Sequence, residues 1–356
     1  MAKLLPLLLS TGLALITVTT ACTPQQNSQQ EAIGQTQQNP QWEAFGQLPI
    51  SLESHQMVAL GDFVYIVGGW NEPNGVHPEV YFTPLTPEQA LNDWQETTAP
   101  LPIRLQHHAV LVHGDALYVL GGDNGFWEGS EVSDRIFRAV PDAQGDISEW
   151  VEVGQLPAPL TIHAVTALDD QVYIMGGSNT FRPGTTVVDT VFTATIAPDG
   201  TFGEFQPLAA FPTPIGWMTA TTIDRRIFAI SGKVEFRPTR LTENVWVAEA
   251  DSDNQLSSFE PRSTVIARQR HATVLLDRTL VVIAGGGTDG VISTVEAATV
   301  DLNGNLEPWT ALAPLPEARY AHAAFARDGY IYVSGGFLRY GSNDTSRDIF
   351  RLPFRP

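Results

Sequence analysis

The chain has 356 residues, of which 39 are acidic and 20 are lysine or arginine, so its formal net charge at pH 7 is −19. This acidity argues against a nucleic-acid-binding protein, because such proteins present a strongly basic surface to the phosphates. Cysteine occurs once, at Cys22, which excludes an internal disulfide and a thiolate metal site.

Residues 1–22 have the composition of an export signal. A single lysine, Lys3, precedes an apolar run over residues 4–18 that is too short to span a bilayer comfortably, and small residues lead up to Cys22. Cys22 resembles the lipidated cysteine of bacterial lipoproteins, although Thr19 stands where leucine is more usual. We therefore expect an exported protein of the bacterial cell envelope, attached to the membrane only through a lipid on Cys22. The alternative is an ordinary secretory signal.

Residues 23–40 are rich in Gln, Asn and Ser and carry almost no hydrophobic side chains. Such a segment cannot offset the entropy cost of ordering its backbone, so we expect a flexible tether. In this interpretation the folded domain comprises residues 41–356.

A short apolar phrase that ends in two small residues recurs six times within residues 41–356. Its last glycine falls at positions 69, 122, 177, 232, 286 and 336, at intervals of 53, 55, 55, 54 and 50 residues. Most copies also have a histidine that opens the preceding apolar strand, an aromatic strand after the glycines, and a further aromatic residue that opens a last strand. A period of about 50 residues built from strands indicates repeats of one small sheet. Each repeat therefore supplies four strands.

Two repeats depart from this pattern. The fourth has Ser231 in place of the first glycine and Trp217-Met218 where the other copies have histidine. The fifth has Glu296 where an aromatic residue is expected. These departures affect local regularity and leave the number of repeats intact.

The order of a histidine strand, a Gly-Gly strand, an Asp-x-hydrophobic-aromatic strand (134–137 and 189–192) and a Trp strand resembles the kelch repeat over residues 41–356. The resemblance implies an all-β fold, a six-bladed β-propeller of four-stranded blades. Galactose oxidase, a kelch-type enzyme, needs a cysteine cross-linked to a tyrosine at its copper site. That chemistry is excluded here, because no cysteine lies within the repeats.

The two ends of the domain complete each other. Residues 41–49 have the pattern of a last strand without the three strands that precede one, and residues 348–353 have the pattern of a third strand without a fourth. We therefore expect the N-terminal strand to close the sixth blade, which removes sheet edges that would otherwise be open to aggregation.

Strand order sorts the loops onto two faces of the propeller. One face receives Asp-rich segments such as residues 251–253, which we interpret as tight turns. The other face receives the long loops after the glycines and the links between blades. These segments are rich in arginine and aromatic residues and also contain His107 and Lys233. From this face we take as ligand-binding candidates Trp70, Arg104, Trp127, Arg182, Arg237, Arg268, Arg270, Arg319, Arg339 and Tyr340.

The recurring histidines at 55, 108, 163, 271 and 322 occupy one position of the repeat. We interpret them as packing residues between blades, because neighbouring copies lie a whole blade apart, too far to share a metal ion at about 2 Å. No nucleophile elbow, P-loop, dinucleotide fingerprint or zinc motif is present. The sequence therefore predicts no metal site and no cofactor.

Two functions of different class remain. The first is a non-catalytic binding module, a monomer that presents the arginine and aromatic face to a protein or to an acidic glycan, because arginine matches carboxylates and aromatic rings stack on sugars. The second is an enzyme that resembles the six-bladed kelch sialic acid mutarotases. It would need an acid–base pair and an arginine that holds a carboxylate, such as Arg268 or Arg319. We favour the binding module, since the sequence carries no signature of catalysis.

Overall fold

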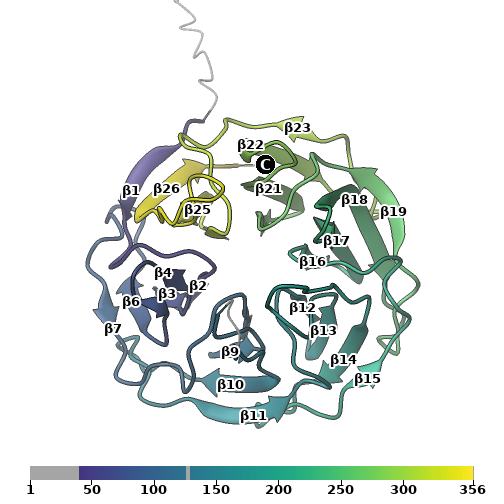
Figure 1. Ribbon diagram of the computed structural model, residues 1–356, viewed down its shortest axis with the longest axis horizontal. Helices are drawn as coiled ribbons and strands as arrows, with labels where there is room; N and C mark the ends of the chain where they lie inside the picture. Colours follow the sequence, from purple (N-terminus) through teal and green to yellow (C-terminus); the bar gives the residue numbers. More distant parts are fainter. Residues whose placement is uncertain (1–39, 126–128, 356) are drawn as a thin grey trace, which may run out of the picture. The chain divides into compact units, whose positions relative to one another are not determined.

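The computed structural model describes residues 40–125 and 129–355, in which all regular elements are β-strands. The predicted leader with Cys22, the tether up to residue 39 and the candidate Trp127 lie outside the described residues. The described residues form one compact unit, in which six four-stranded antiparallel sheets are arranged as blades around a common axis (Figure 1). The predicted six-bladed propeller is thus confirmed. Nothing in the described part is a helix of the length and apolarity needed to cross a membrane.

Each of the first five blades takes four strands in sequence order, from an inner strand near the axis to an outer strand at the rim (Figure 1). Blade 1 consists of β2 (Gln56–Leu60), β3 (Phe63–Val67), β6 (Val80–Pro84) and β7 (Gln95–Glu96), with a small hairpin of β4 (Trp70–Asn71) and β5 (Gly75–Val76). Blade 2 consists of β8 (Ala109–His113), β9 (Ala116–Leu120), β10 (Arg135–Ala139) and β11 (Val151–Gln155). Blade 3 consists of β12 (Ala164–Leu168), β13 (Gln171–Met175), β14 (Val191–Thr195) and β15 (Gln206–Pro207).

Blades 4 and 5 contain the longest strands, and blade 6 joins the two ends of the domain. Blade 4 consists of β16 (Thr219–Ile223), β17 (Arg226–Glu235), β18 (Arg240–Glu249) and β19 (Glu260–Thr264). Blade 5 consists of β20 (Ala272–Leu276), β21 (Thr279–Gly286), β22 (Val291–Thr299) and β23 (Thr310–Ala311). Blade 6 consists of β24 (Ala323–Arg327), β25 (Tyr330–Ser334), β26 (Asp348–Pro353) and β1 (Glu43–Gln47).

The ring closes as the sequence predicts, because β1 pairs antiparallel with β26 and Glu43 lies opposite Arg351. The guanidinium of Arg351 lies 3.8 Å from the centre of the Phe45 ring. Phe45 and Leu48 are both buried in a cluster that also takes side chains from blade 1. The closing strand is therefore held by backbone pairing and by hydrophobic packing together.

The hydrophobic core lies between adjacent blades. One cluster joins Tyr65 and Val67 of blade 1 to Leu117 and Val119 of blade 2. The second strands β3, β9 and β13 are almost wholly buried, because each sheet is covered on both faces by its neighbours. A strand buried on both faces is apolar at successive positions, which explains the continuous Val, Ile and Leu content of the repeated phrase.

The glycine pair allows the chain to pass close to the neighbouring segment. Gly69 has φ +106°, and a Cβ at this position would lie 2.7 Å from the Cβ of His55 and 2.9 Å from the carbonyl oxygen of Glu53. In the fifth repeat the equivalent pair is Ala284 and Gly285, with φ 50° and 113°. The sequence interpretation, which used Gly286 as the last glycine, placed this repeat one residue too late.

The recurring histidines pack between blades, as expected. The ring of His108 lies so close to blade 1 that a Cβ at Gly68 would come within 2.9 Å of its Cε1 atom. His55 forms a hydrogen bond of 2.9 Å with Ser334 of blade 6. Burial lowers the pKa of His55 and His108 to about 3 and that of His163 to about 4, so these rings are neutral in the folded protein.

Candidate functional site

A pocket of about 970 Å³ opens on the axis, lined by the loops that follow the glycine pairs and by the links between blades. This is the face that the loop topology predicts to be rich in arginine and aromatic residues. A narrower cavity of about 200 Å³ shares His107, Trp217 and Arg270 with the pocket and continues among the inner strands. The larger volume is within the range of small-molecule binding sites.

Three equivalent positions recur near the axis in every blade, and some of their residues, including Glu53, Trp70 and Lys233, line the pocket. The first and middle positions are consecutive residues in the link before the inner strand, and the third position directly follows the glycine pair. The residue at the first position forms an antiparallel bridge with the residue at the third position. The bridged pairs are Glu53 with Trp70, Gln106 with Asp123, Thr161 with Ser178, Gly216 with Lys233, Gln269 with Gly286, and Tyr320 with Phe337. The middle positions are Ser54, His107, Ile162, Trp217, Arg270 and Ala321.

All six middle residues are left-handed, with φ between 48° and 56°. Few residues other than glycine adopt this conformation, and a bulky or β-branched side chain such as Trp217 or Ile162 does so at a steric cost. Backbone hydrogen bonds join five of the six neighbouring pairs of these residues; for example, His107 N donates to Ser54 O at 3.3 Å and Ile162 N donates to His107 O at 3.2 Å. The backbone thus fixes six side chains at the axis whatever their identity.

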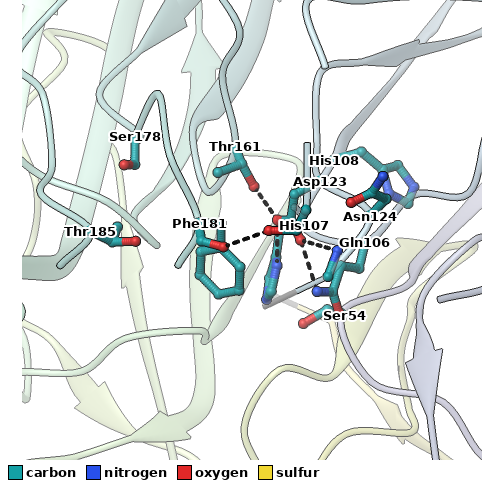
Figure 2. A network of polar contacts seen from close by, with 12 residues as sticks. Ser54, Gln106, His107, His108, Asp123, Asn124, Thr161, Ser178, Phe181 and Thr185 are labelled. Atoms are coloured by element: carbon teal, nitrogen blue, oxygen red, sulfur yellow. Dashed lines mark hydrogen bonds and ion pairs between the residues drawn. The ribbon is translucent and has the colours of Figure 1, made fainter. Parts of the chain in front are cut away.

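Asp123 forms the most extensive polar network of the site (Figure 2). Its carboxylate is fully buried and accepts hydrogen bonds from Gln106 Nε2 at 2.8 Å, His107 Nδ1 at 2.9 Å, Thr161 Oγ1 at 2.6 Å and Gly125 N at 3.1 Å. When the ring is uncharged, donation from Nδ1 leaves Nε2 as an acceptor. Among the described residues this Nε2 atom is buried and has no hydrogen-bond partner.

Glu53 is a buried acid that, unlike Asp123, lines the pocket itself. Its carboxylate accepts a hydrogen bond from the hydroxyl of Ser54, and its Oε2 atom lies 3.7 Å from Nη1 of Arg270. Burial raises the pKa of Glu53, while the charge of Arg270 opposes this rise. A carboxyl group with a raised pKa can donate a proton at a less acidic pH than an exposed one.

Cations and aromatic rings face each other across the pocket. The guanidinium of Arg270 lies 4.2 Å from the centre of the Trp217 ring, and Lys233 Nζ lies 5.5 Å from the same centre. Lys233 Nζ is also 4.5 Å from the centre of the Phe236 ring. Burial and the nearby Arg270 lower the pKa of Lys233 to about 8. Arg182 and Arg237 line the pocket from exposed positions at its rim.

The charge of this pocket is opposite in sign to that of the whole chain. Its described lining contains four cationic side chains, Arg182, Lys233, Arg237 and Arg270, and two carboxylates, Glu53 and Glu235. Glu235 is already paired with Arg240, which does not line the pocket, at 3.5 Å. The arrangement therefore favours an anionic ligand.

Four of the predicted candidates line the pocket, namely Trp70, Arg182, Arg237 and Arg270. Three others lie outside it: Arg104 donates to Val76 O at 2.8 Å, Arg339 pairs with Asp344 at 3.2 Å, and Tyr340 donates to Gly287 O at 3.0 Å.

Arg268 and Arg319 are fully buried between the blades and do not reach the pocket. Arg268 donates to Ala284 O at 3.0 Å and to the carboxylate of Glu296. Glu296, which stands where the repeat pattern has an aromatic residue, therefore serves as the ion-pair partner of Arg268. Arg319 donates to Gly335 O at 2.8 Å and lies 5.0 Å from the centre of the Phe350 ring. The expectation that either arginine holds a ligand carboxylate is therefore wrong, because both side chains are used to join strands.

The pocket also contains groups that the candidate set omits, above all Glu53, His107, Trp217 and Lys233. A comparison of the repeats with one another finds them, because the three axial positions vary from copy to copy, whereas the preceding residue is Leu or Ile in four copies and the residue after the second position is His in five. No group of three or more His, Cys, Asp or Glu side chains arranged to hold a metal ion is present among the residues that the structure describes.

Comparison with known proteins agrees with this fold. No protein-family model matches the chain. It is 25% identical to Kelch-like protein 36 of Bos taurus over 252 residues, 68% of this chain and 37% of that protein. It is 26% identical to Kelch-like protein terF of Aspergillus terreus over 247 residues, 65% of this chain and 50% of that protein. The chain thus spans about a third to a half of the length of these relatives.

Among solved structures, that of YjhT superimposes with a TM-score of 0.68 at 14% identity and covers 85% of this chain and 95% of its own. Six four-stranded blades around an axial pocket define a closed β-propeller. Its repeats resemble kelch repeats, and its fold is that of a six-bladed kelch-type propeller.

Proposed function

We propose that this protein is a binding propeller whose axial pocket receives an anionic group, carried by an acidic saccharide or by an acidic segment of a partner protein. The similarity to Kelch-like proteins and the open loop face support a binding role. The anionic ligand is inferred from one observation, the convergence of Arg182, Lys233, Arg237 and Arg270 on a pocket in a chain of net charge −19. Arginine binds carboxylate and sulfate bidentately, and the rings of Trp70, Phe181 and Phe236 offer apolar faces to a sugar.

A thermal-unfolding screen at low salt tests this proposal. Glucuronate, sialic acid and a sulfated monosaccharide form one arm with glucose as the neutral control, and a Glu-rich peptide forms the other with its Gln counterpart as control. A ligand at a hundred times its Kd adds about 2.7 kcal/mol to the free energy of unfolding. We expect stabilisation by the acidic members of one arm only, and loss of that stabilisation in Arg270→Gln.

Arg339→Gln is the matched control variant, because Arg339 lies on the same face, is exposed and does not line the pocket. Equal stabilisation by acidic and neutral members, or none by any acidic member, would show that the pocket is not an anion site. The export and lipid attachment expected from residues 1–22 form a separate proposal with its own test below.

A second candidate function, interconversion of sugar anomers, is favoured by the acid–base groups in the same wall. Glu53 has a raised pKa and His107 presents Nε2 as an acceptor, while Arg270 is placed to hold a carboxylate. Opening a hemiacetal ring needs a base for the anomeric hydroxyl and an acid for the ring oxygen, and closing it reverses both transfers. Exchange between the anomers of sialic acid, followed by NMR, should be accelerated by the protein and slowed in Glu53→Gln. Identical exchange with and without the protein would rule this activity out.

A further inference from the structure

Lysine is nearly absent from this chain. Of its 20 basic residues only Lys3 and Lys233 are lysines, and the other 18 are arginines. Lys3 belongs to the predicted export signal, so Lys233 is the sole lysine among residues 40–125 and 129–355. It directly follows Gly232 in β17 and occupies one of the three axial positions of blade 4. The one lysine of the described domain thus lies in the wall of the pocket.

The surroundings of Lys233 differ from those of a lysine that serves solubility or ion pairing. The residue is 8% exposed, and within the described part of the chain its ammonium group has no carboxylate within 4.0 Å and no hydrogen-bond acceptor. Its neighbours are the rings of Trp217 and Phe236 and the guanidinium of Arg270, which lies against the same indole.

A cation in such a place is costly, and both burial and the charge of Arg270 lower the pKa of Lys233 to about 8. At neutral pH roughly a tenth of the amine is then uncharged, compared with less than a thousandth for a lysine with the ordinary pKa. An uncharged amine is a nucleophile, and an adjacent cation and an apolar pocket are the two features that activate lysine in proteins. Arginine at this position would retain the positive charge and lose this reactivity.

We propose that Lys233 forms a reversible imine with the carbonyl carbon of a small oxo acid whose carboxylate is bound by Arg270. The ligand class comprises α-oxo acids and the open-chain form of acidic sugars, which combine an aldehyde or ketone with a carboxylate. The inference rests on the proposed anion-binding function of the same pocket and adds a covalent step to it.

The step is balanced without any oxidant or reductant. The nitrogen lone pair of Lys233 attacks the carbonyl carbon, the carbonyl oxygen takes up one proton and the nitrogen gives up one, which leaves a neutral carbinolamine. The C–O bond then breaks, the oxygen leaves as water with a second proton, and the remaining N–H proton returns to the pocket. Glu53 and His107 lie in the same wall and can exchange these protons. Hydrolysis reverses every transfer and releases the free amine.

Reductive trapping in the full chain tests the proposal. The protein is incubated with glyoxylate and cyanoborohydride, and peptide mass spectrometry measures secondary-amine adducts at Lys233, at Lys3 and at the terminal amine. Acetaldehyde replaces glyoxylate in a parallel reaction, because it has the carbonyl and lacks the carboxylate. We expect at least about tenfold more adduct at Lys233 than at the reference amines with glyoxylate, and no such preference with acetaldehyde.

Variants separate reactivity from anion binding. Lys233→Arg should remove the preferred adduct, Arg270→Gln should reduce it to the level seen with acetaldehyde, and Arg339→Gln should leave it unchanged. Glycolate, which replaces the carbonyl of glyoxylate with a hydroxyl, reports anion binding alone when its binding is measured by calorimetry.

Each outcome bears on one of the two proposals. Binding of glycolate and glyoxylate with no preferred adduct at Lys233 would overturn the imine and leave the anion pocket intact. An adduct at Lys233 that forms equally well from acetaldehyde, or that survives Arg270→Gln, would overturn the oxo acid as the ligand class. A lack of binding by both acids would overturn the anion pocket and the imine together.

Discussion

Two arginines that lie two residues apart should have separable roles, and replacing each in turn tests this assignment of the site. Arg268 is fully buried and joins strands through Ala284 O and the Glu296 carboxylate. Arg270 lines the axial pocket against Trp217. We expect Arg268→Met to lower stability and leave ligand affinity unchanged, and Arg270→Gln to lower ligand affinity with little effect on stability.

The magnitudes follow from the contacts. Removing one partner of a buried ion pair costs about 3–5 kcal/mol, because the remaining charge and the Ala284 carbonyl lose their donor. At roughly 2.1 cal/mol/K per residue, a domain of about 315 residues unfolds with an entropy of about 0.66 kcal/mol/K, so Arg268→Met should lower Tm by about 5–8 °C. Losing one charge-assisted hydrogen bond costs about 1.5–3 kcal/mol, which weakens binding about 10- to 150-fold in Arg270→Gln.

Circular dichroism gives the Tm of each variant, and calorimetry with glucuronate gives its affinity, with Arg339→Gln as the control for both. The assignment would be refuted by Arg268→Met binding glucuronate as weakly as Arg270→Gln does while melting at the parent temperature. It would equally be refuted by a larger fall in Tm for Arg270→Gln than for Arg268→Met.

Three further predictions concern the closing strand, the histidines and the leader. Phe45→Ala should cost about 3–5 kcal/mol, and deleting residues 41–49 should destabilise all six blades, since β1 completes blade 6; a truncated domain that melts at the parent temperature contradicts this. The pKa of His55, His108 and His322 is lowered to about 3 and that of His163 to about 4. Because the unfolded rings protonate below pH 6.5 and the folded ones do not, stability should be full above pH 6.5 and fall as pH drops towards 4, by up to about 1.4 kcal/mol per histidine per pH unit; urea unfolding at pH 7.5 and 5 measures this, and equal values at both pH contradict it. Cys22→Ala should abolish incorporation of an alkyne-labelled fatty acid and move the protein from the membrane to the soluble fraction, whereas unchanged incorporation rules out lipidation at Cys22.

The fold was predictable because its signal is repeated. One glycine phrase is weak evidence, but six copies at a nearly constant interval fix the number of blades, and the two incomplete ends fix how the ring closes. The exception is the fifth repeat, in which Ala284 adopts the left-handed conformation, with φ 50°, that glycine adopts in four other repeats. In the sequence, Gly285 and Gly286 look like the glycine pair of this repeat. Only the backbone angles show that the equivalent pair is Ala284 and Gly285, one residue earlier.

The sequence predicted which face of the propeller carries the pocket, but it identified only some of the residues that line it. Loop topology placed Arg182, Arg237 and Arg270 on the pocket side, but a loop position does not show whether a side chain points to solvent or between strands. Arg268 and Arg319 illustrate the difference. They occupy the repeat position that is Leu52, Leu105, Leu160 and Ile215 in the other copies, all of which are buried. Alignment of the repeats would have indicated that Arg268 and Arg319 are buried. Counting the charged residues on this face could not distinguish buried arginines from exposed ones.

Pairing of β1 with β26 also determines when the propeller can be completed. Glu43 and Arg351, which form an ion pair across this junction, are 308 residues apart in sequence. Contacts of such long range form slowly, because the loop between them must close first. A chain that emerges from its N-terminus therefore keeps β1 without its partner until the last strand is available, and β26 exposes an open edge until β1 arrives. Chaperone demand during biogenesis should be concentrated in this interval.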